Sequence, residues 1–213
     1  MKRTVLFICC MTFCIMSYAQ AKFGIEAGYA LSAPVSVSPA LRHPLNGVQI
    51  DGFVDYRSTK KPLFGFKAGV GYKFVGYSSS KNHLLCPSAT SAEYKESITK
   101  HVLYIPLRLT LNYDVTEDVS LRFLTGPSIS YNWQDLKFEH SGSIPESGSS
   151  KLNEVYYPVG CSWGVGIASI YKHLSFETAY DMGLYNRTRR DHPSYDTNTF
   201  YDRDFYLTVG YIF

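Results

Sequence analysis

Three residue types that together can activate a nucleophile for acyl transfer occur in this chain as Ser130, His101 and Glu177. Such a set works only when its members converge on one point. In the alternating patterns described below, His101 and Ser130 fall on opposite faces of their segments, and no spacing motif links the three residues. We therefore predict that the chain has no catalytic residues and is not an enzyme.

Histidines and cysteines suggest no metal site. Four histidines are scattered in polar connecting segments, where we expect them to be solvated: His43, His83, His140 and His192. Beyond the first twenty residues the only cysteines are Cys86 and Cys161. One distant pair is neither a metal-binding motif nor a disulfide framework, although a single bridge between them stays open. We predict no metal and no cofactor.

Charged residues form two further groups. The first alternates with glycine and serine along β-like segments and carries both signs, as expected for an ion-pair network buried inside a closed sheet or for the wall of a narrow conduit. Its members are Glu26, Asp51, Lys67, Lys73, Arg108, Arg122, Glu177, Asp181, Asp202 and Asp204. Asp55 falls on the same face, and we expect Arg108 or Arg122 to meet Asp202 and Asp204. The second is Arg187, Arg189 and Arg190 near the C-terminal end, whose guanidinium groups suit phosphate. An ordinary solvated loop is the alternative for this second group.

Alternation of apolar and polar residues dominates the chain, and no stretch longer than about ten residues has a helical apolar period. Eight segments alternate, and each has one face that is almost free of charge. They are 22–31, 47–57, 63–78, 99–113, 118–133, 155–170, 173–185 and 200–213. The connections between them are alternately long and short, which places all long loops at one end of an up-and-down meander and both termini at the other.

The apolar face must point outward. An eight-stranded barrel has no room inside for about forty bulky side chains, whereas glycines, small residues and paired charges would fit there. We therefore predict an all-β fold, an eight-stranded antiparallel up-and-down transmembrane β-barrel. Prolines test this model, because each removes a ladder hydrogen bond. We expect Pro158 near the outer rim, and Pro106 and Pro127 at bulges or weak points.

The first residues have the order of a secretory signal. Lys2 and Arg3 precede an apolar run, and Ser17 to Ala19 supply a small-x-small site, so we predict a cleaved signal peptide at 1–19 and a single domain at 20–213. No later segment is long and apolar enough for a transmembrane helix. Without Lys2 and Arg3 the chain has 19 basic and 18 acidic residues, so its charge predicts no nucleic-acid partner.

The stretch HVLYIPLRLTLNYDVTEDVSLRFLTGPSISY, residues 101–131, resembles the outer-membrane β-barrel domain family that includes PorT-like proteins and small barrels of the OmpX or OmpA type in Gram-negative bacteria. The resemblance rests on an aromatic-Ile-Pro-Leu strand at 104–107, a tight acidic turn and a strand ending in Gly-Pro. The final strand, with Tyr211 and the terminal Phe213, looks like the signal read by the barrel-assembly machinery. No catalytic residue comes with the resemblance.

The resemblance implies location and partners. We expect the protein in the outer membrane, surrounded by lipid and lipopolysaccharide, with long loops extracellular and termini periplasmic. Arg187, Arg189 and Arg190 would then be candidate contacts for lipopolysaccharide phosphates. The predicted function is an integral, non-catalytic barrel whose surface loops serve envelope structure or bind a partner that the sequence does not identify. The alternatives are a lipid-modifying enzyme of the lipid A deacylase or acyltransferase type and a small passive channel.

Overall fold

The computed structural model describes residues 21–33, 35–36, 44–58, 63–83, 92–141, 146–151, 156–188 and 200–213. The predicted signal peptide at 1–19 lies outside these residues, as do Cys86, Arg189 and Arg190. Within them, no helix is long and apolar enough to cross a membrane.

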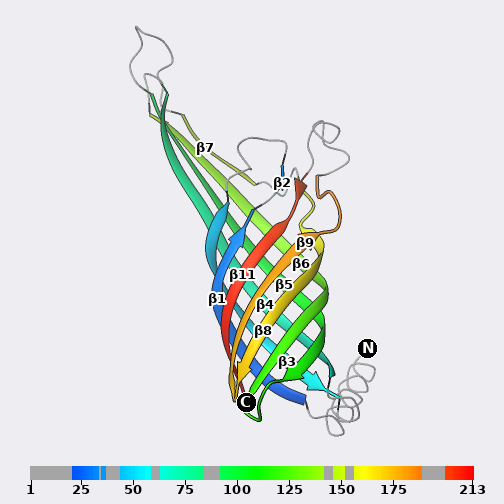
Figure 1. Cartoon of the computed structure of the whole chain (residues 1–213). Helices are drawn as coiled ribbons and strands as arrows, with labels where there is room; N and C mark the ends of the chain where they lie inside the picture. Colours follow the sequence, from blue (N-terminus) through cyan, green and yellow to red (C-terminus); the bar gives the residue numbers. More distant parts are fainter. Residues whose placement is uncertain are drawn as a thin grey trace, which may run out of the picture.

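Eight of the described strands form a closed antiparallel barrel (Figure 1). Along the chain they are β1 (Ala21–Ser32), β3 (Leu45–Arg57), β4 (Phe64–His83), β5 (Ala92–Asp114), β6 (Val119–Ser141), β8 (Val159–Tyr171), β9 (Leu174–Gly183) and β11 (Arg203–Ile212). Sequential strands pair with one another, and β1 pairs with β11 from Gly24↔Ile212 to Ser32↔Asp204 to complete the ring. The predicted fold is confirmed.

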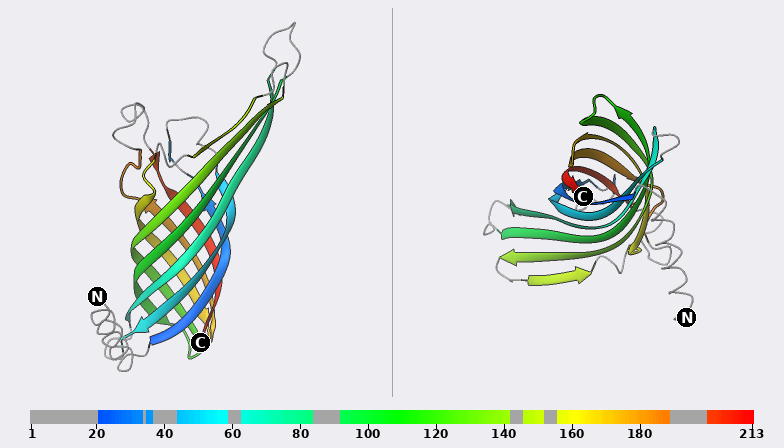
Figure 2. Two further views of the ribbon diagram at one scale, coloured as in Figure 1. Left: turned by 180° about the vertical axis from the view of Figure 1, so that it is seen from behind. Right: turned by 90° about the horizontal axis from the view of Figure 1, so that it is seen from below.

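Three short strands accompany the barrel. β2 (Val35–Ser36) pairs with β10 (Phe200–Tyr201) above the ends of β1 and β11. β7 (Glu146–Lys151) pairs with β6 from Asp135↔Lys151 to His140↔Glu146. The C-terminus and the start of β1 lie together at the end with the short turns (Figure 2), as the alternating connection lengths predict.

The strands β4, β5 and β6 run well beyond the rim as one extended sheet (Figures 1 and 2). We expected β4 to end near Ser78, β5 to begin near Thr99 and β6 to end near Trp133. Their pairing continues farther, to His83↔Ala92 between β4 and β5 and to Glu93↔Ser141 between β5 and β6. These extensions are rich in serine and charged residues. A sheet that has water on both faces needs no apolar alternation, so the pattern that reveals the barrel strands is missing there.

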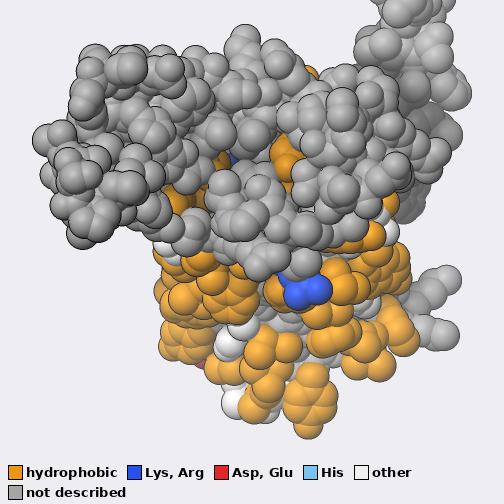
Figure 3. Space-filling model, turned by 90° about the horizontal axis from the view of Figure 1, so that it is seen from above, with side chains coloured by type: hydrophobic (Ala, Val, Ile, Leu, Met, Phe, Trp, Pro, Cys, Tyr) orange, Lys and Arg blue, Asp and Glu red, His pale blue; other side chains and the backbone are white. Residues whose placement is uncertain are grey.

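Alternation separates two faces in every barrel strand. The outer face carries exposed aliphatic and aromatic side chains, for example Leu109 and Ile167 with exposed fractions of 63% and 61%. Viewed from above, hydrophobic side chains cover the visible wall of the barrel (Figure 3). Near the outer end of this apolar band the rings of Tyr72, His101 and Trp133 contact one another. Aromatic girdles of this kind mark the edges of the apolar band in outer-membrane barrels.

Two of the three prolines weaken the ladder between β5 and β6. Pairing stops after Pro106↔Ser128 and resumes at Leu109↔Thr125 in the same register, so the gap is a weak point and not a bulge. Within the gap Gly126 has a φ of 154°, a conformation that favours glycine, and its carbonyl accepts a hydrogen bond from the side chain of Arg108. Pro158 lies just before β8, at the rim as expected.

Candidate functional site

Inside the barrel lies a continuous network of ion pairs. The structure places all ten predicted members of the network on the inner face, with Asp204 half-buried and the others buried. Strand alternation puts them there, because every second residue of β1, β3, β4, β5, β6, β9 and β11 faces inward. Three further charged residues join them: Asp55, which the alternation also places on this face, and Lys100 and Arg187.

Lys67 is the centre of the middle layer. Its ammonium group lies 2.9 Å from the Glu26 carboxylate and 2.6 Å from that of Glu177, and so links β4 to β1 and β9 across the barrel. The same nitrogen lies 4.3 Å from the centroid of the Phe53 ring. All three charged side chains are at most 7% exposed. One cation therefore serves two buried carboxylates.

Arg108 forms a second cross-barrel link. Its guanidinium donates to the Asp181 carboxylate of β9 and to the Gly126 carbonyl that the proline gap leaves free. Gly164 makes room for this pair, because a Cβ atom at that position would lie 2.1 Å from Asp181 Oδ1 and 2.4 Å from Arg108 Nη2. The missing side chain at this position therefore gives space to opposing charged groups.

Two more ion pairs lie toward the ends. Arg122 donates to Asp55 at 2.8 Å near the short turns, and Lys73 contacts Asp204 at 2.7 Å toward the outer end. From the sequence we expected Asp202 and Asp204 to meet Arg108 or Arg122. That expectation was wrong, because partners across a tilted barrel are set by height along the axis, which strand order alone does not reveal.

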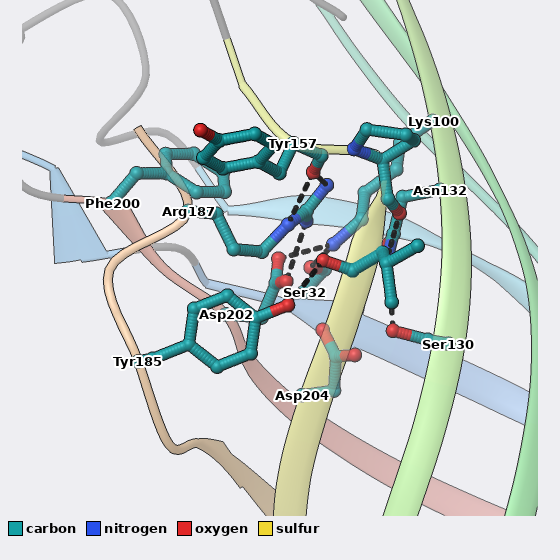
Figure 4. A network of polar contacts seen from close by, with 12 residues as sticks. Ser32, Lys100, Ser130, Asn132, Tyr157, Tyr185, Arg187, Phe200, Asp202 and Asp204 are labelled. Carbon is teal, nitrogen blue, oxygen red and sulfur yellow. Dashed lines mark hydrogen bonds and ion pairs between the residues drawn. The ribbon is translucent and has the colours of Figure 1, made fainter. Parts of the chain in front are cut away.

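Asp202 is held by two cations at the outer end (Figure 4). Its carboxylate lies 2.7 Å from Lys100 Nζ and 2.6 Å from Arg187 Nη1. Arg187 also donates to the Tyr157 carbonyl through Nε and Nη2. Arg187 has an exposed fraction of 2% and is therefore buried inside the protein. The expected contact of Arg187 with lipopolysaccharide therefore does not fit the structure, and Arg189 and Arg190 lie outside the described residues.

Sequence reasoning missed Lys100 and Arg187 as network members for different reasons. Lys100 faces inward like Tyr104 and Arg108, because every second residue of a strand lies on the same face. Following this alternation back along the strand from Tyr104 would have found Lys100. Arg187 belongs to no strand, and its inward direction depends on backbone hydrogen bonds between Tyr157 N and Arg187 O and between Arg187 N and Phe200 O. No local pattern signals such contacts.

Asp202 lies beyond the apolar band, because it precedes Arg203, an exposed charged residue on the outer face of β11. Burial works to raise the pKa of its carboxyl group. Lys100 and Arg187 outweigh burial through their charges and hydrogen bonds, and they hold this pKa well below its usual range. The carboxylate stays ionised in mild acid, so the ion pairs of Asp202 with Lys100 and Arg187 persist there. We call these three residues the Asp202 clamp.

Two clusters of buried apolar residues lie inside the barrel. Toward the outer end, one cluster includes Ala30, Val75, Tyr156 and Phe200, and the last two rings lie 4.6 Å apart. Toward the short turns, Phe53, Ile170 and Ile212 pack together. A path for water or ions along the lumen would have to run past both clusters and the ion pairs.

The structure separates the three candidate catalytic residues. His101 points to the outer face, where it stacks on Trp133 and its Nδ1 lies 2.6 Å from the Tyr72 hydroxyl. Ser130 accepts a hydrogen bond from Asn132, and Glu177 is bound by Lys67. Among the described residues, no group of three or more His, Cys, Asp or Glu side chains is arranged to hold a metal ion.

The chain is similar to known proteins in sequence and in structure. A family model described as "Outer membrane protein beta-barrel domain" matches residues 18–189. Similar solved structures include Ail of Yersinia pestis in complex with the heparin analogue sucrose octasulfate, at 14% identity and a TM-score of 0.49, covering 91% of this chain and 99% of that chain. Neisserial surface protein A has 12% identity, a TM-score of 0.41 and coverage of 91% and 99%.

A third similar structure is a major outer membrane protein of Thermus thermophilus, with 12% identity, a TM-score of 0.44 and coverage of 91% and 99%. No curated protein sequence matches the chain. The family model thus bears out the outer-membrane β-barrel resemblance, while the PorT-like subgroup stays a prediction.

Replacing Lys67 with methionine should destabilise the barrel strongly. The change leaves Glu26 and Glu177 buried without their shared cation, which costs on the order of 3–5 kcal/mol when one partner of a buried pair is removed. Urea unfolding in lipid vesicles, followed by the gel shift between folded and unfolded barrel, measures this loss. The matched control also changes Glu26 and Glu177 to glutamine and should recover most of the stability. Unfolding of the single variant at the wild-type urea concentration would contradict the network model.

The Asp202 clamp predicts a specific pH dependence. Because the folded-state pKa of Asp202 is lowered, its contribution to stability is full above the unfolded value of about 3.8 and disappears as the pH falls through the lower folded value. The difference in unfolding free energy between wild type and Asp202→Asn should therefore stay constant from about pH 7 to pH 5 and shrink below about pH 4. Asp118→Asn, at an exposed carboxylate 3.8 Å from Lys172, is the control and should show a small difference throughout. If the difference in unfolding free energy between wild type and Asp202→Asn grew as the pH fell, the lowered pKa of Asp202 would be refuted.

Proposed function

The chain belongs to the outer-membrane β-barrel domain family, and on that premise we propose that it is a sealed, non-catalytic barrel that binds extended segments of partner proteins at its extracellular sheet. The protein resides in the outer membrane. In barrels of this class the short turns face the periplasm and the long connections face outward, so the sheet formed by the ends of β4, β5 and β6 together with β7 projects from the cell.

One observation carries the proposal: among the described strands, this sheet has two open edges. β4 loses its β3 neighbour beyond Asn46↔Gly76, yet continues to His83. On the other side, β7 has β6 as its sole partner among the described strands. Each edge offers a row of backbone N–H and C=O groups, which is the template for adding a further strand.

The chemistry of these edges favours an extended polypeptide as the partner. Their sequences, YSSSKNH at 77–83 and ESGSSK at 146–151, contain Tyr77 as the sole bulky apolar residue. An apolar helix face would find little to bury here, whereas strand addition depends on main-chain hydrogen bonds and tolerates polar side chains. Antiparallel or parallel pairing of a partner segment with either edge would extend the existing four-stranded sheet.

Neither alternative function gains support from the lumen or from the candidate triad. A passive channel needs a continuous polar path, but buried apolar clusters and cross-barrel ion pairs lie along the lumen. A lipid-modifying enzyme needs a nucleophile beside a base, but His101 points outward and Ser130 lies on the inner face. A mass spectrum of lipid A that is unchanged in cells lacking the gene agrees with a non-catalytic role.

Several sequence predictions belong to this proposal. Export by the signal peptide at 1–19, recognition of Tyr211 and Phe213 by the barrel-assembly machinery, and phosphate contacts by Arg189 and Arg190 remain proposals. Support for the terminal signal comes from the exposure of Phe213 on the outer face, at 65%, and from its ring contact with Tyr211.

Photo-crosslinking in intact cells tests the sheet edges. A photoreactive residue at Ser80 in β4 or at Ser149 in β7 should form adducts with a partner, because both positions lie on strands with an open edge. Ser120, at the opposite end of β6, is the matched control and should form none. Hydrogen exchange of the purified pair should show new protection of β7 amides. Adducts from Ser120 alone, or binding without new protection in either edge strand, would reject strand addition.

Planar bilayers test the sealed lumen. Folded wild-type protein, checked by its gel shift before and after reconstitution, is expected to give no conductance steps, because the buried apolar clusters around Phe53 and Phe200 and the ion pairs are expected to obstruct hydrated ions. Resolved steps from the wild type would instead establish a passive channel.

A further inference from the structure

A cavity of about 10 Å³ lies in the middle of the lumen. Its lining comes from several strands and includes Gln49 and Asp51 of β3, Tyr104 of β5, and Glu26, Lys67 and Glu177. A space of this size accommodates one water molecule or one small ion. The charged residues that line the cavity are all buried, so an occupant lies away from both solvent compartments.

Three buried oxygen atoms of the lining are Gln49 Oε1, Asp51 Oδ1 and Tyr104 Oη, on residues with exposed fractions of 3%, 4% and 8%. The Tyr104 hydroxyl is hydrogen-bonded to the Asp51 carboxylate, so Gln49 Oε1 is the one of the three that has no partner. Buried polar atoms are nearly always paired, and an unpaired one costs free energy. An unpaired amide oxygen beside a buried carboxylate points to an occupant that binds oxygen.

The charges around the cavity do not balance. Carboxylates of Glu26, Asp51 and Glu177 line it together with two cations, Lys67 and Arg108. Lys67 is shared between Glu26 and Glu177, and Arg108 is paired with Asp181. Among the described residues, Asp51 is the lumen carboxylate without a salt bridge, although Lys67 and Lys73 act on it electrostatically from farther away. One positive charge is missing.

Gly71 of β4 leaves space for two of these oxygens. A Cβ atom at this position would lie 1.8 Å from Asp51 Oδ1 and 2.7 Å from Tyr104 Oη, so both oxygens crowd the space above the glycine. The third, on Gln49, belongs to the residue whose amide nitrogen lies 3.3 Å from Asp51 Oδ2. Carboxylate, amide carbonyl and hydroxyl oxygens are the ligands preferred by hard cations.

We propose that this cavity binds one monovalent cation of the size of sodium, coordinated by the Asp51 carboxylate, the Gln49 carbonyl and the Tyr104 hydroxyl. A single charge corrects the local imbalance, whereas a divalent ion would reverse it. The ion joins β3 to β5 across β4 and is enclosed when the barrel closes. This inference does not depend on the proposed role of the extracellular sheet.

Refolding in matched salts tests the site. Wild-type protein is unfolded in urea and refolded into vesicles in sodium chloride or in choline chloride of equal ionic strength, because the enclosed ion must enter before closure. Each tenfold increase in sodium above its dissociation constant should raise the folding equilibrium constant about tenfold, while choline should have no such effect. Sodium-23 relaxation of the folded protein gives a second, direct readout of a bound ion.

Variants assign the effect to the cavity. Asp51→Asn keeps the side-chain shape and should abolish the sodium effect. If this variant does not fold, Tyr104→Phe should still fold and should bind sodium more weakly than the wild type. Ser175→Ala, which removes another unpaired buried oxygen outside this cavity, should retain the full sodium effect.

Three results would overturn the proposal. They are equal wild-type stability in sodium and choline, a sodium effect that persists in Asp51→Asn, and an infrared band of a protonated carboxyl group that Asp51→Asn removes, since a proton would then supply the missing charge.

Discussion

The requirement that every backbone polar group in hydrocarbon has a hydrogen-bond partner governs this structure. It is met by closing the sheet, with β1 paired to β11 at one seam and β5 paired to β6 at another. The same requirement explains why the gap beside Pro127 does not leave a free carbonyl, because the Arg108 side chain donates to Gly126. Closure also creates the second feature of the molecule, an interior that is shielded from both water and lipid.

Closure at eight strands leaves an interior only wide enough for side chains. Charged residues placed there must find partners, and they do so across the barrel: Lys67 reaches β1 and β9, and Arg108 reaches β9. Glycine at Gly71 and Gly164 makes this reach possible, because any side chain at these positions would occupy the space of an opposing carboxylate. Ion pairs thereby link strands that share no backbone hydrogen bonds, and Asp51 is the carboxylate that this pairing leaves out.

Beyond the apolar band the requirement is relaxed, because water can satisfy backbone groups. β4, β5 and β6 continue there as an open sheet, and β7 adds a strand at one side. Edges that would be prohibitive in hydrocarbon are permitted in water, where they become available for pairing with another chain. The barrel thus has a sealed part within the membrane and an unsealed part outside it, and the proposed function belongs to the unsealed part.

The sequence alone determined the strand number, the alternation of long and short connections, the outward direction of the apolar face and the inward direction of ten charged residues, since a period of two and a count of bulky side chains are local properties. Only the tertiary structure decided which charges meet. Asp202 binds Lys100 and Arg187, and Asp204 binds Lys73, in place of the expected arginines. It also decided how far the extracellular sheet extends. Strand tilt sets the height of each residue along the axis, and tilt arises from the closed ring as a whole, so no single segment records it.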